Sequence, residues 1–168
     1  KDRGNVLALV REDSDAPGEV WLATLGREDM EWKQLTDLNP LASELTLGVT
    51  ESIHWKGADG WDIQGFLITP PGYRNGGRVP LITIVHGGPT SSASNVYLPA
   101  TPNNQAQLYA AAGMAVLLPN PRGSTGWGME FAEANLGDIG GKDWMDIQMG
   151  IDHCVEIGVA DPERLGIG

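Results

Sequence analysis

The sequence feature that most constrains the fold is a short run of branched apolar residues leading directly into a pair of glycines. Residues 81–85 read Leu-Ile-Thr-Ile-Val, and His86-Gly87-Gly88-Pro89 follows without a spacer. A strand that is apolar on both faces belongs in a sheet covered on both sides. Ligands of open α/β sheets bind beyond the carboxyl ends of the strands. We therefore expect the glycine pair to lie at a binding edge.

The chain after residue 47 alternates predicted strands with predicted helices, which indicates an α/β fold with a mostly parallel sheet. The expected strands are 51–56, 61–69, 81–85 and 114–118, the last closed by Pro119; the expected helices are 105–112 and 143–157. A turn is expected at 161–164 and a final strand from 165. The apolar face of the second helix is expected to comprise Trp144, Ile147, Ile151, Cys154 and Val155.

The first 47 residues follow a different pattern. Short strands are expected at 6–10, 19–25 and 31–35, and the first two flank a segment dense in turn-forming residues. Three short antiparallel strands are too few to be stable alone. We interpret residues 1–47 as the closing part of a larger all-β unit and residues 48–168 as a second domain.

Composition excludes several classes of function. The 168 residues include 11 Lys and Arg against 22 Asp and Glu, a net charge of −11, so we expect neither nucleic-acid nor anionic-membrane binding. A lone cysteine, Cys154, cannot form an internal disulfide, and the three histidines lie far apart, so we expect no metal and no cofactor. The compartment stays open, with the lone cysteine favouring the cytoplasm.

The glycine pair suggests a specific chemistry. Glycines let backbone N–H groups approach a substrate closely, and such donors stabilise the oxyanion of a tetrahedral acyl-transfer intermediate, each by roughly 2.7–4 kcal/mol. Gly87 and Gly88 are therefore candidate catalytic residues. The alternative is a tight turn, which a glycine pair after any strand could form. We interpret His86 as a residue that orders the loop.

A second glycine-rich loop, residues 120–128, follows the next predicted strand. It lacks both the Walker pattern and the GxGxxG pattern, so it does not predict a phosphate site. Arg122 is either a buried ion-pair partner or a substrate clamp. Trp127 either packs against the fold or forms a pocket wall.

Four blocks, at 86–89, 120–128, 140–146 and 161–168, resemble successive blocks of the prolyl oligopeptidase family of serine peptidases. The acylaminoacyl-peptidase and dipeptidyl-aminopeptidase branches are the most similar, and residues 35–40 resemble the exit from that family's β-propeller. The resemblance implies that residues 1–47 end a propeller and that residues 48–168 are the N-terminal portion of an α/β-hydrolase domain. It also implies a peptide substrate.

The same resemblance implies roles for individual residues. Gly88 is favoured over Gly87 as the oxyanion donor, and Thr90 lies near the first substrate pocket. Pro89, Thr90, Arg122 and Trp127 are the candidate substrate-binding residues.

The catalytic serine of this fold lies on a Gly-x-Ser-x-Gly elbow directly after a strand. No such motif occurs between residues 1 and 168, and the resemblance places the serine about three residues beyond Gly168. We therefore expect this chain to be a fragment that is inactive alone. Two alternatives remain open: a carboxylesterase of the same fold, and a non-catalytic module that binds a partner through its sheet edge. Self-association and association with the rest of the enzyme also remain open.

Overall fold

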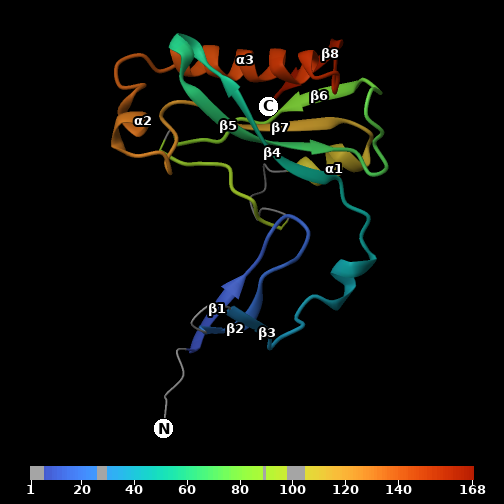
Figure 1. Cartoon of the computed structure of the whole chain (residues 1–168). Coiled ribbons are helices and arrows are strands. Elements are labelled where there is room, and N and C mark those ends of the chain that lie inside the picture. Colours follow the sequence, from blue (N-terminus) through green and yellow to red (C-terminus); the bar gives the residue numbers. More distant parts are fainter. Residues whose placement is uncertain (1–5, 26–29, 89, 98–104) are drawn as a thin grey trace. The chain divides into compact units, whose positions relative to one another are not determined.

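The computed structural model describes residues 6–25, 30–88, 90–97 and 105–168. The chain divides into two compact units (Figure 1). Unit 1 comprises residues 1–46 and 95–100, and unit 2 comprises residues 47–94 and 101–168.

Unit 1 contains a three-stranded antiparallel sheet of order β1-β2-β3. The strands are β1 (Val6–Arg11), β2 (Glu19–Leu25) and β3 (Met30–Gln34), and a 3₁₀ turn (Pro40–Glu44) follows. All three predicted strands are thereby confirmed. The Arg11 guanidinium lies 5.2 Å from the ring centres of both Trp21 and Trp32, so cation–π contacts tie the three strands together.

Unit 2 is built on a five-stranded sheet of order β4-β5-β7-β6-β8. Its strands are β4 (Val49–Lys56), β5 (Asp62–Thr69), β6 (Val79–Thr83), β7 (Ala115–Asn120) and β8 (Ala160–Ile167). The pairs β4–β5 and β5–β7 are antiparallel, and only β6–β7 and β6–β8 are parallel. The expectation of a mostly parallel sheet was therefore wrong. A short connection makes β4 and β5 an antiparallel hairpin, whereas parallel pairing needs the longer crossovers that contain helices.

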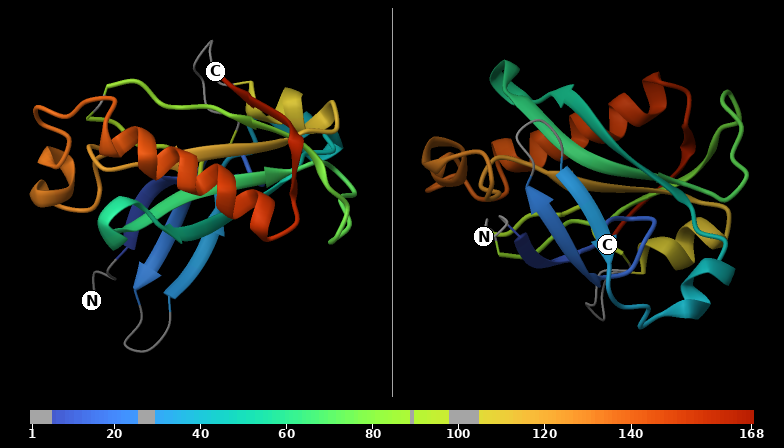
Figure 2. Two further views of the ribbon diagram at one scale, coloured as in Figure 1. Left: turned by 90° about the horizontal axis from the view of Figure 1, so that it is seen from above. Right: turned by 60° about the horizontal axis from the view of Figure 1, so that its bottom comes forward.

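Helices cover both faces of this sheet (Figures 1 and 2), as the two-sided apolar strands predicted. Helix α1 (Ala106–Ala111) contacts β5 and β7, and α3 (Lys142–Glu156) contacts β4, β7 and β8. A short helix, α2 (Met129–Glu133), was not predicted. One apolar cluster includes Leu81, Leu117 and Cys154, and the other includes Ala110 and Val116. No helix in the described residues has the length and apolar character needed to cross a membrane.

Two strand boundaries differ from expectation because of prolines. Pro119 does not close β7; it lies opposite Gly65 on β5, past the last residue of β7 that pairs with β6. Beyond that point one side of β7 has no ladder to complete, so a missing N–H is tolerated. The turn expected at 161–164 instead lies within the bounds of β8, where the pairing with β6 shifts register. A hydrogen bond typical of a turn is nevertheless present there, because Glu163 N–H donates to Asp161 Oδ1 at 3.0 Å.

The buried face of α3 also differs from expectation. Ile147 and Cys154 are buried as expected, but Trp144 is 38% exposed, and Asp146, which was not expected on this face, is fully buried. The cause is Trp55 on β4, whose indole N–H donates to the Asp146 carbonyl at 2.8 Å. Its ring lies so close to Gly150 that a Cβ there would come within 2.7 Å. The helix therefore presents the line of residues 146, 150 and 154 to the sheet.

Candidate functional site

The glycine loop begins directly after β6, at the carboxyl end of that strand. Gly87 and Gly88 are exposed, and Thr90 is exposed as well. Gly88 has a φ of +147°, and a Cβ there would lie 2.7 Å from the Thr90 nitrogen. A Cβ on Gly87 would meet no atom within 4 Å. Only Gly88 is thus required to be glycine by the backbone. Pro89 lies outside the described residues.

The His86 imidazole bonds to groups on both of its nitrogens. Nδ1 lies 3.1 Å from the Gly87 carbonyl oxygen, and Nε2 lies 2.9 Å from Ser124 Oγ. A carbonyl oxygen only accepts, so Nδ1 carries the proton; in the neutral ring Nε2 then accepts from the Ser124 hydroxyl. In a trans peptide the carbonyl oxygen and the following N–H point in opposite directions. Holding the Gly87 oxygen at the imidazole therefore turns the Gly88 N–H away from it.

Two further contacts join this loop to the loop after β7. Thr125 N–H donates to the Ser91 carbonyl at 2.9 Å. The fully buried Asn120 side chain accepts from Ala93 N–H at 2.7 Å and donates to the Ala93 carbonyl at 3.1 Å. The same amide donates to Gln64 on β5 at 2.8 Å. The loops after the two neighbouring parallel strands therefore form one hydrogen-bonded assembly.

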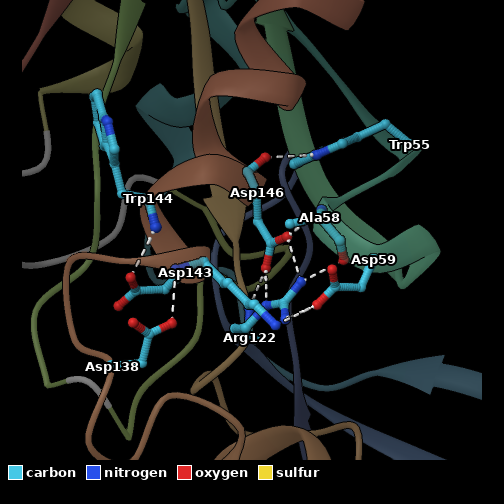
Figure 3. Close-up of polar contacts among 9 residues, drawn as sticks. Trp55, Ala58, Asp59, Arg122, Asp138, Asp143, Trp144 and Asp146 are labelled. Atoms are coloured by element: carbon cyan, nitrogen blue, oxygen red, sulfur yellow. Dashed lines mark hydrogen bonds and ion pairs between the residues drawn. The ribbon is translucent and has the colours of Figure 1, made fainter.

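Arg122 in the second loop forms a buried ion pair with Asp146 of α3 (Figure 3). Arg122 Nε donates to Asp146 Oδ2 at 2.7 Å, and Nη2 donates to Oδ1 at 2.9 Å. Nη2 also donates to the Ala58 carbonyl at 2.5 Å. The hydrogen bonds with Asp146 raise the pKa of the Arg122 guanidinium above its usual range. The side chain is 4% exposed and satisfied by its own chain, which favours the ion-pair interpretation over the substrate clamp.

At the rim of this ion pair lies an open groove with a volume of about 560 Å³. Lys142 Nζ lies 2.7 Å from the Asp59 carboxylate, and this hydrogen bond lowers the pKa of Asp59. The groove is lined by Asp59, Trp61, Arg122, Glu130, Ala134, Asp138 and Lys142.

Trp127 belongs to an adjoining aromatic surface. Its ring centre lies 5.5 Å from that of Phe131, which in turn lies 5.7 Å from Trp61. Trp127 is 40% exposed and lines a shallow pocket of about 300 Å³. Packing and pocket lining, the two roles that the sequence left open, are thus combined in one side chain.

The structure connects the predicted site residues through two separate sets of contacts. His86 connects Gly87 and Gly88 to the second loop. The Arg122 guanidinium lies 5.1 Å from the Trp61 ring centre, and Trp61 and Trp127 both pack against Phe131. Sequence reasoning missed Asp146. The spacing of Asp146, Gly150 and Cys154 at four-residue intervals was the available signal, because a small residue at Gly150 permits close packing.

In the described ranges no three His, Cys, Asp or Glu side chains are grouped to hold a metal ion.

Comparison with known proteins gives the family. The profile of the prolyl oligopeptidase family matches residues 100–168. Acylaminoacyl peptidase from Pyrococcus horikoshii superimposes with a TM-score of 0.80 at 31% identity, over 97% of this chain. The chain belongs to the prolyl oligopeptidase family of serine peptidases.

The alignments with individual relatives cover more of the chain than residues 100–168, which the family profile matches. An uncharacterized peptidase of Bacillus subtilis, YuxL, is 37% identical over 155 residues, which is 91% of this chain. Dipeptidyl-peptidase 5 of Schizosaccharomyces pombe is 31% identical over 116 residues, 68% of this chain. The chain spans only 22% of the Bacillus protein, 16% of the Schizosaccharomyces protein and 25% of the Pyrococcus protein.

Proposed function

We propose that the whole protein is a serine peptidase that hydrolyses short peptides through an acyl-enzyme, and that this chain supplies one oxyanion donor, the Gly88 N–H. The observation that carries the proposal is the fixed Gly87–Gly88 peptide. The bond from His86 Nδ1 to the Gly87 oxygen turns the Gly88 N–H away from the imidazole, at the carboxyl end of β6. A preorganised donor of this kind stabilises a developing oxyanion.

We further propose that β1 to β3 are the last strands of a β-propeller and that unit 2 is the N-terminal portion of an α/β-hydrolase domain. Superposition of 97% of the chain on a Pyrococcus acylaminoacyl peptidase supports this assignment. The mixed sheet flanked by helices is consistent with it.

The position of the nucleophile is part of the proposal. Gly168 N–H donates to the Thr83 carbonyl at 2.9 Å, and Val85 N–H donates to the Gly168 carbonyl at 3.1 Å. The end of β8 therefore lies beside the start of the glycine loop. A serine elbow directly after β8 in the whole protein would bring its hydroxyl to the same edge as the Gly88 N–H.

The Ser124–His86 pair is not this nucleophile. A hydroxyl next to an imidazole is the arrangement of a nucleophile and its base, but Ser124 is only 1% exposed, so a substrate carbonyl carbon cannot reach it. The imidazole Nδ1, which a carboxylate orients in a catalytic triad, is bonded to the Gly87 carbonyl.

Peptide substrates are expected from the family, and Thr90 and Trp127 are the proposed substrate contacts because both are exposed near the glycine loop or the loop joined to it. Pro89 remains a candidate from sequence alone. Arg122 is proposed to act on the substrate only indirectly, since its donors bond to Asp146 and Ala58.

The test compares two matched glycine substitutions in the whole protein. Gly88→Ala should lower kcat on a chromogenic peptide substrate on the order of 100-fold, because the new Cβ would collide with the Thr90 nitrogen and displace the donor peptide. Gly87→Ala adds the same methyl group where no atom lies within 4 Å, so its loss should be much smaller. Equal losses would contradict the assignment of Gly88. A wild-type protein that hydrolyses ester substrates but not amide substrates would contradict the proposal of a peptidase.

A further inference from the structure

We propose that Asp146, Arg122 and Ser124 are positioning residues for the oxyanion loop and that they act through the His86 imidazole. The inference rests on the proposed role of the Gly88 N–H and extends it to a residue on α3. None of the three side chains is exposed, with exposures of 0%, 4% and 1%. Each is a positioning residue rather than a catalytic one.

The first link runs from the Gly87 carbonyl to Ser124. The Gly87 peptide has one restraint from the imidazole, the 3.1 Å contact with Nδ1. That contact requires a proton on Nδ1, because a carbonyl oxygen only accepts, and the Ser124 hydroxyl at 2.9 Å from Nε2 holds the ring in the orientation that makes this contact. Without the hydroxyl, the ring is free to turn away from the Gly87 carbonyl, and the proton is then no longer held on Nδ1 and can move to Nε2. The Gly87–Gly88 peptide would then lose its restraint.

The second link fixes the Ser124 hydroxyl through the turn that carries it. Ser124 N–H donates to the Pro121 carbonyl at 3.0 Å, closing the turn. Gly123 N–H donates to the Phe131 carbonyl at 2.8 Å. At the Gly123 φ of +96°, a Cβ would lie 2.3 Å from the amide of the buried Asn135. The turn therefore has no room to shift as a unit on that side.

The third link anchors the turn to α3 through one carboxylate. Asp146 accepts from both the side chain and the backbone of Arg122, with Oδ2 3.2 Å from the Arg122 nitrogen (Figure 3). Its Oδ1 accepts from Ala58 N–H at 2.8 Å. A Cβ on the adjoining Gly57 would lie 2.3 Å from this oxygen, so the β4–β5 connection closes tightly over it. The carboxylate on α3 is thus held by the β4–β5 connection and by the loop after β7, and it holds the turn in return.

The geometry distinguishes positioning from stability alone. A buried ion pair contributes little net stability compared with apolar residues of similar volume. This pair lies at the base of a chain of contacts, made of hydrogen bonds and the backbone of residues 122–124, that ends at the Gly87 carbonyl. A displacement of about 1 Å at a reacting centre can cost 100-fold in rate.

The spectroscopic test uses the 168-residue chain labelled with ¹⁵N-histidine, in mildly alkaline buffer. His86→Gln identifies the His86 signals among the three histidines. The wild type should show the Nδ1–H tautomer at His86. Ser124→Ala should shift the population toward Nε2–H and move the Gly88 amide resonance. Ser94→Ala, which removes an exposed hydroxyl from the segment that follows the glycine pair, should do neither. An unchanged tautomer in Ser124→Ala would overturn the proposal.

Asp146→Asn tests the far end of the path, with near-UV circular dichroism as the check on folding. If the variant is folded, the His86 tautomer should shift as in Ser124→Ala, and an unshifted tautomer would overturn the role of Asp146. If Asp146→Asn unfolds, the same measurement is made on Arg122→Lys. A lysine keeps the positive charge but cannot donate to both carboxylate oxygens in a planar fork. A folded Arg122→Lys variant with an unshifted tautomer would equally overturn that role.

The kinetic arm separates this inference from the proposed function. In the whole protein, Ser124→Ala should lower kcat by about 10- to 100-fold with little change in KM, because the donor acts in the transition state. A rise in KM of about 10- to 100-fold at constant kcat would overturn the positioning role of Ser124. An inactive wild-type protein that still shows the tautomer shift would refute the proposed peptidase and leave the path from Asp146 to Gly87 standing.

Discussion

The Asp146 carboxylate carries no exposed surface and accepts hydrogen bonds from Arg122 and Ala58. An ionised carboxylate without partners could not remain in such a place, because desolvation costs far more than one hydrogen bond returns. The Asp146 carboxylate can therefore be buried only because Arg122 and Ala58 donate hydrogen bonds to it.

Removing one member of this pair should be costly. We expect Asp146→Asn to lower the free energy of unfolding of the 168-residue chain by about 3–5 kcal/mol, because the Arg122 charge stays buried without its counter-charge. Urea unfolding followed by circular dichroism measures the change.

A double variant serves as the control for that experiment. Arg122→Met combined with Asp146→Leu removes both charges and should cost less than Asp146→Asn alone. A single variant within 0.5 kcal/mol of wild type, the range typical of surface substitutions, would refute the buried pair as described.

Residue-level reasoning from sequence singled out Arg122 but left its role open, and it missed Asp146. The loop motif indicated that Arg122 is either buried with a partner or directed at substrate, but it did not name the partner. Asp146 looked like a solvent-facing helix residue because helical periodicity was judged from apolar side chains. The contact of Asp146 with Trp55 joins residues 91 positions apart in sequence, and no local pattern encodes it.

At the scale of elements, a carboxylate holds the end of β3 to the start of β2. Glu19 is buried, and Leu38 N–H donates to its Oε1 at 2.7 Å, while the Thr36 hydroxyl donates to Oε2. Thr36 Oγ1 in turn accepts from Val20 N–H at 2.9 Å. The hydrogen bond from Thr36 lowers the pKa of Glu19 from 4.5.

The sign of this shift predicts acid sensitivity in unit 1. A lowered pKa in the folded state means that the contribution to stability is present above pH 4.5 and is lost as the pH falls through the folded-state value. Amide hydrogen-exchange protection at Val20 and Leu38 should therefore decrease below pH 4.5. Glu19→Gln should lower protection at neutral pH and remove most of this pH dependence. Protection at Ile63, at the buried start of β5, is the internal control.

Packing of α3 against the sheet predicts the behaviour of the lone thiol. Cys154 is fully buried, and desolvation raises its pKa to about 12. Because the thiolate is the reactive form, a maleimide or disulfide reagent should label the folded 168-residue chain far more slowly than the urea-unfolded chain. Gly150→Ala should accelerate labelling, since its methyl group would lie 2.7 Å from the Trp55 ring and push the helix outward. Labelling of the folded wild type at the unfolded rate would contradict the packing.

Elements themselves were predictable where local chemistry decides them. The hairpin of β4 and β5, both helices α1 and α3, and the three strands of unit 1 follow from periodicity and turn residues. Strand direction was not predictable in the same way. β5 lies between β4 and β7 and runs antiparallel to both, a pairing between segments about 50 residues apart that no turn specifies.

At the scale of the whole molecule, the described residues include the proposed oxyanion loop, and the serine that is hydrogen-bonded to His86, Ser124, is buried. We expect the purified 168-residue chain not to hydrolyse aminoacyl or acyl-dipeptide chromogenic substrates above the background rate, whereas the whole protein should hydrolyse them. Ser124→Ala in the 168-residue chain is the matched control for trace activity. Turnover by the wild-type chain that this substitution abolishes would show that Ser124 can act as a nucleophile.

The sequence by itself determined which loop is the candidate for the chemistry. Apolar strands followed by glycines specify a buried sheet with exposed backbone at its edge, because both properties arise from neighbouring residues. Only the tertiary structure decided how that loop is held. The contacts of His86 with Ser124, of Asn120 with Ala93 and of Arg122 with Asp146 join residues 24 to 38 positions apart. Such contacts depend on which faces the packed elements turn toward one another, and that orientation is set by the core as a whole.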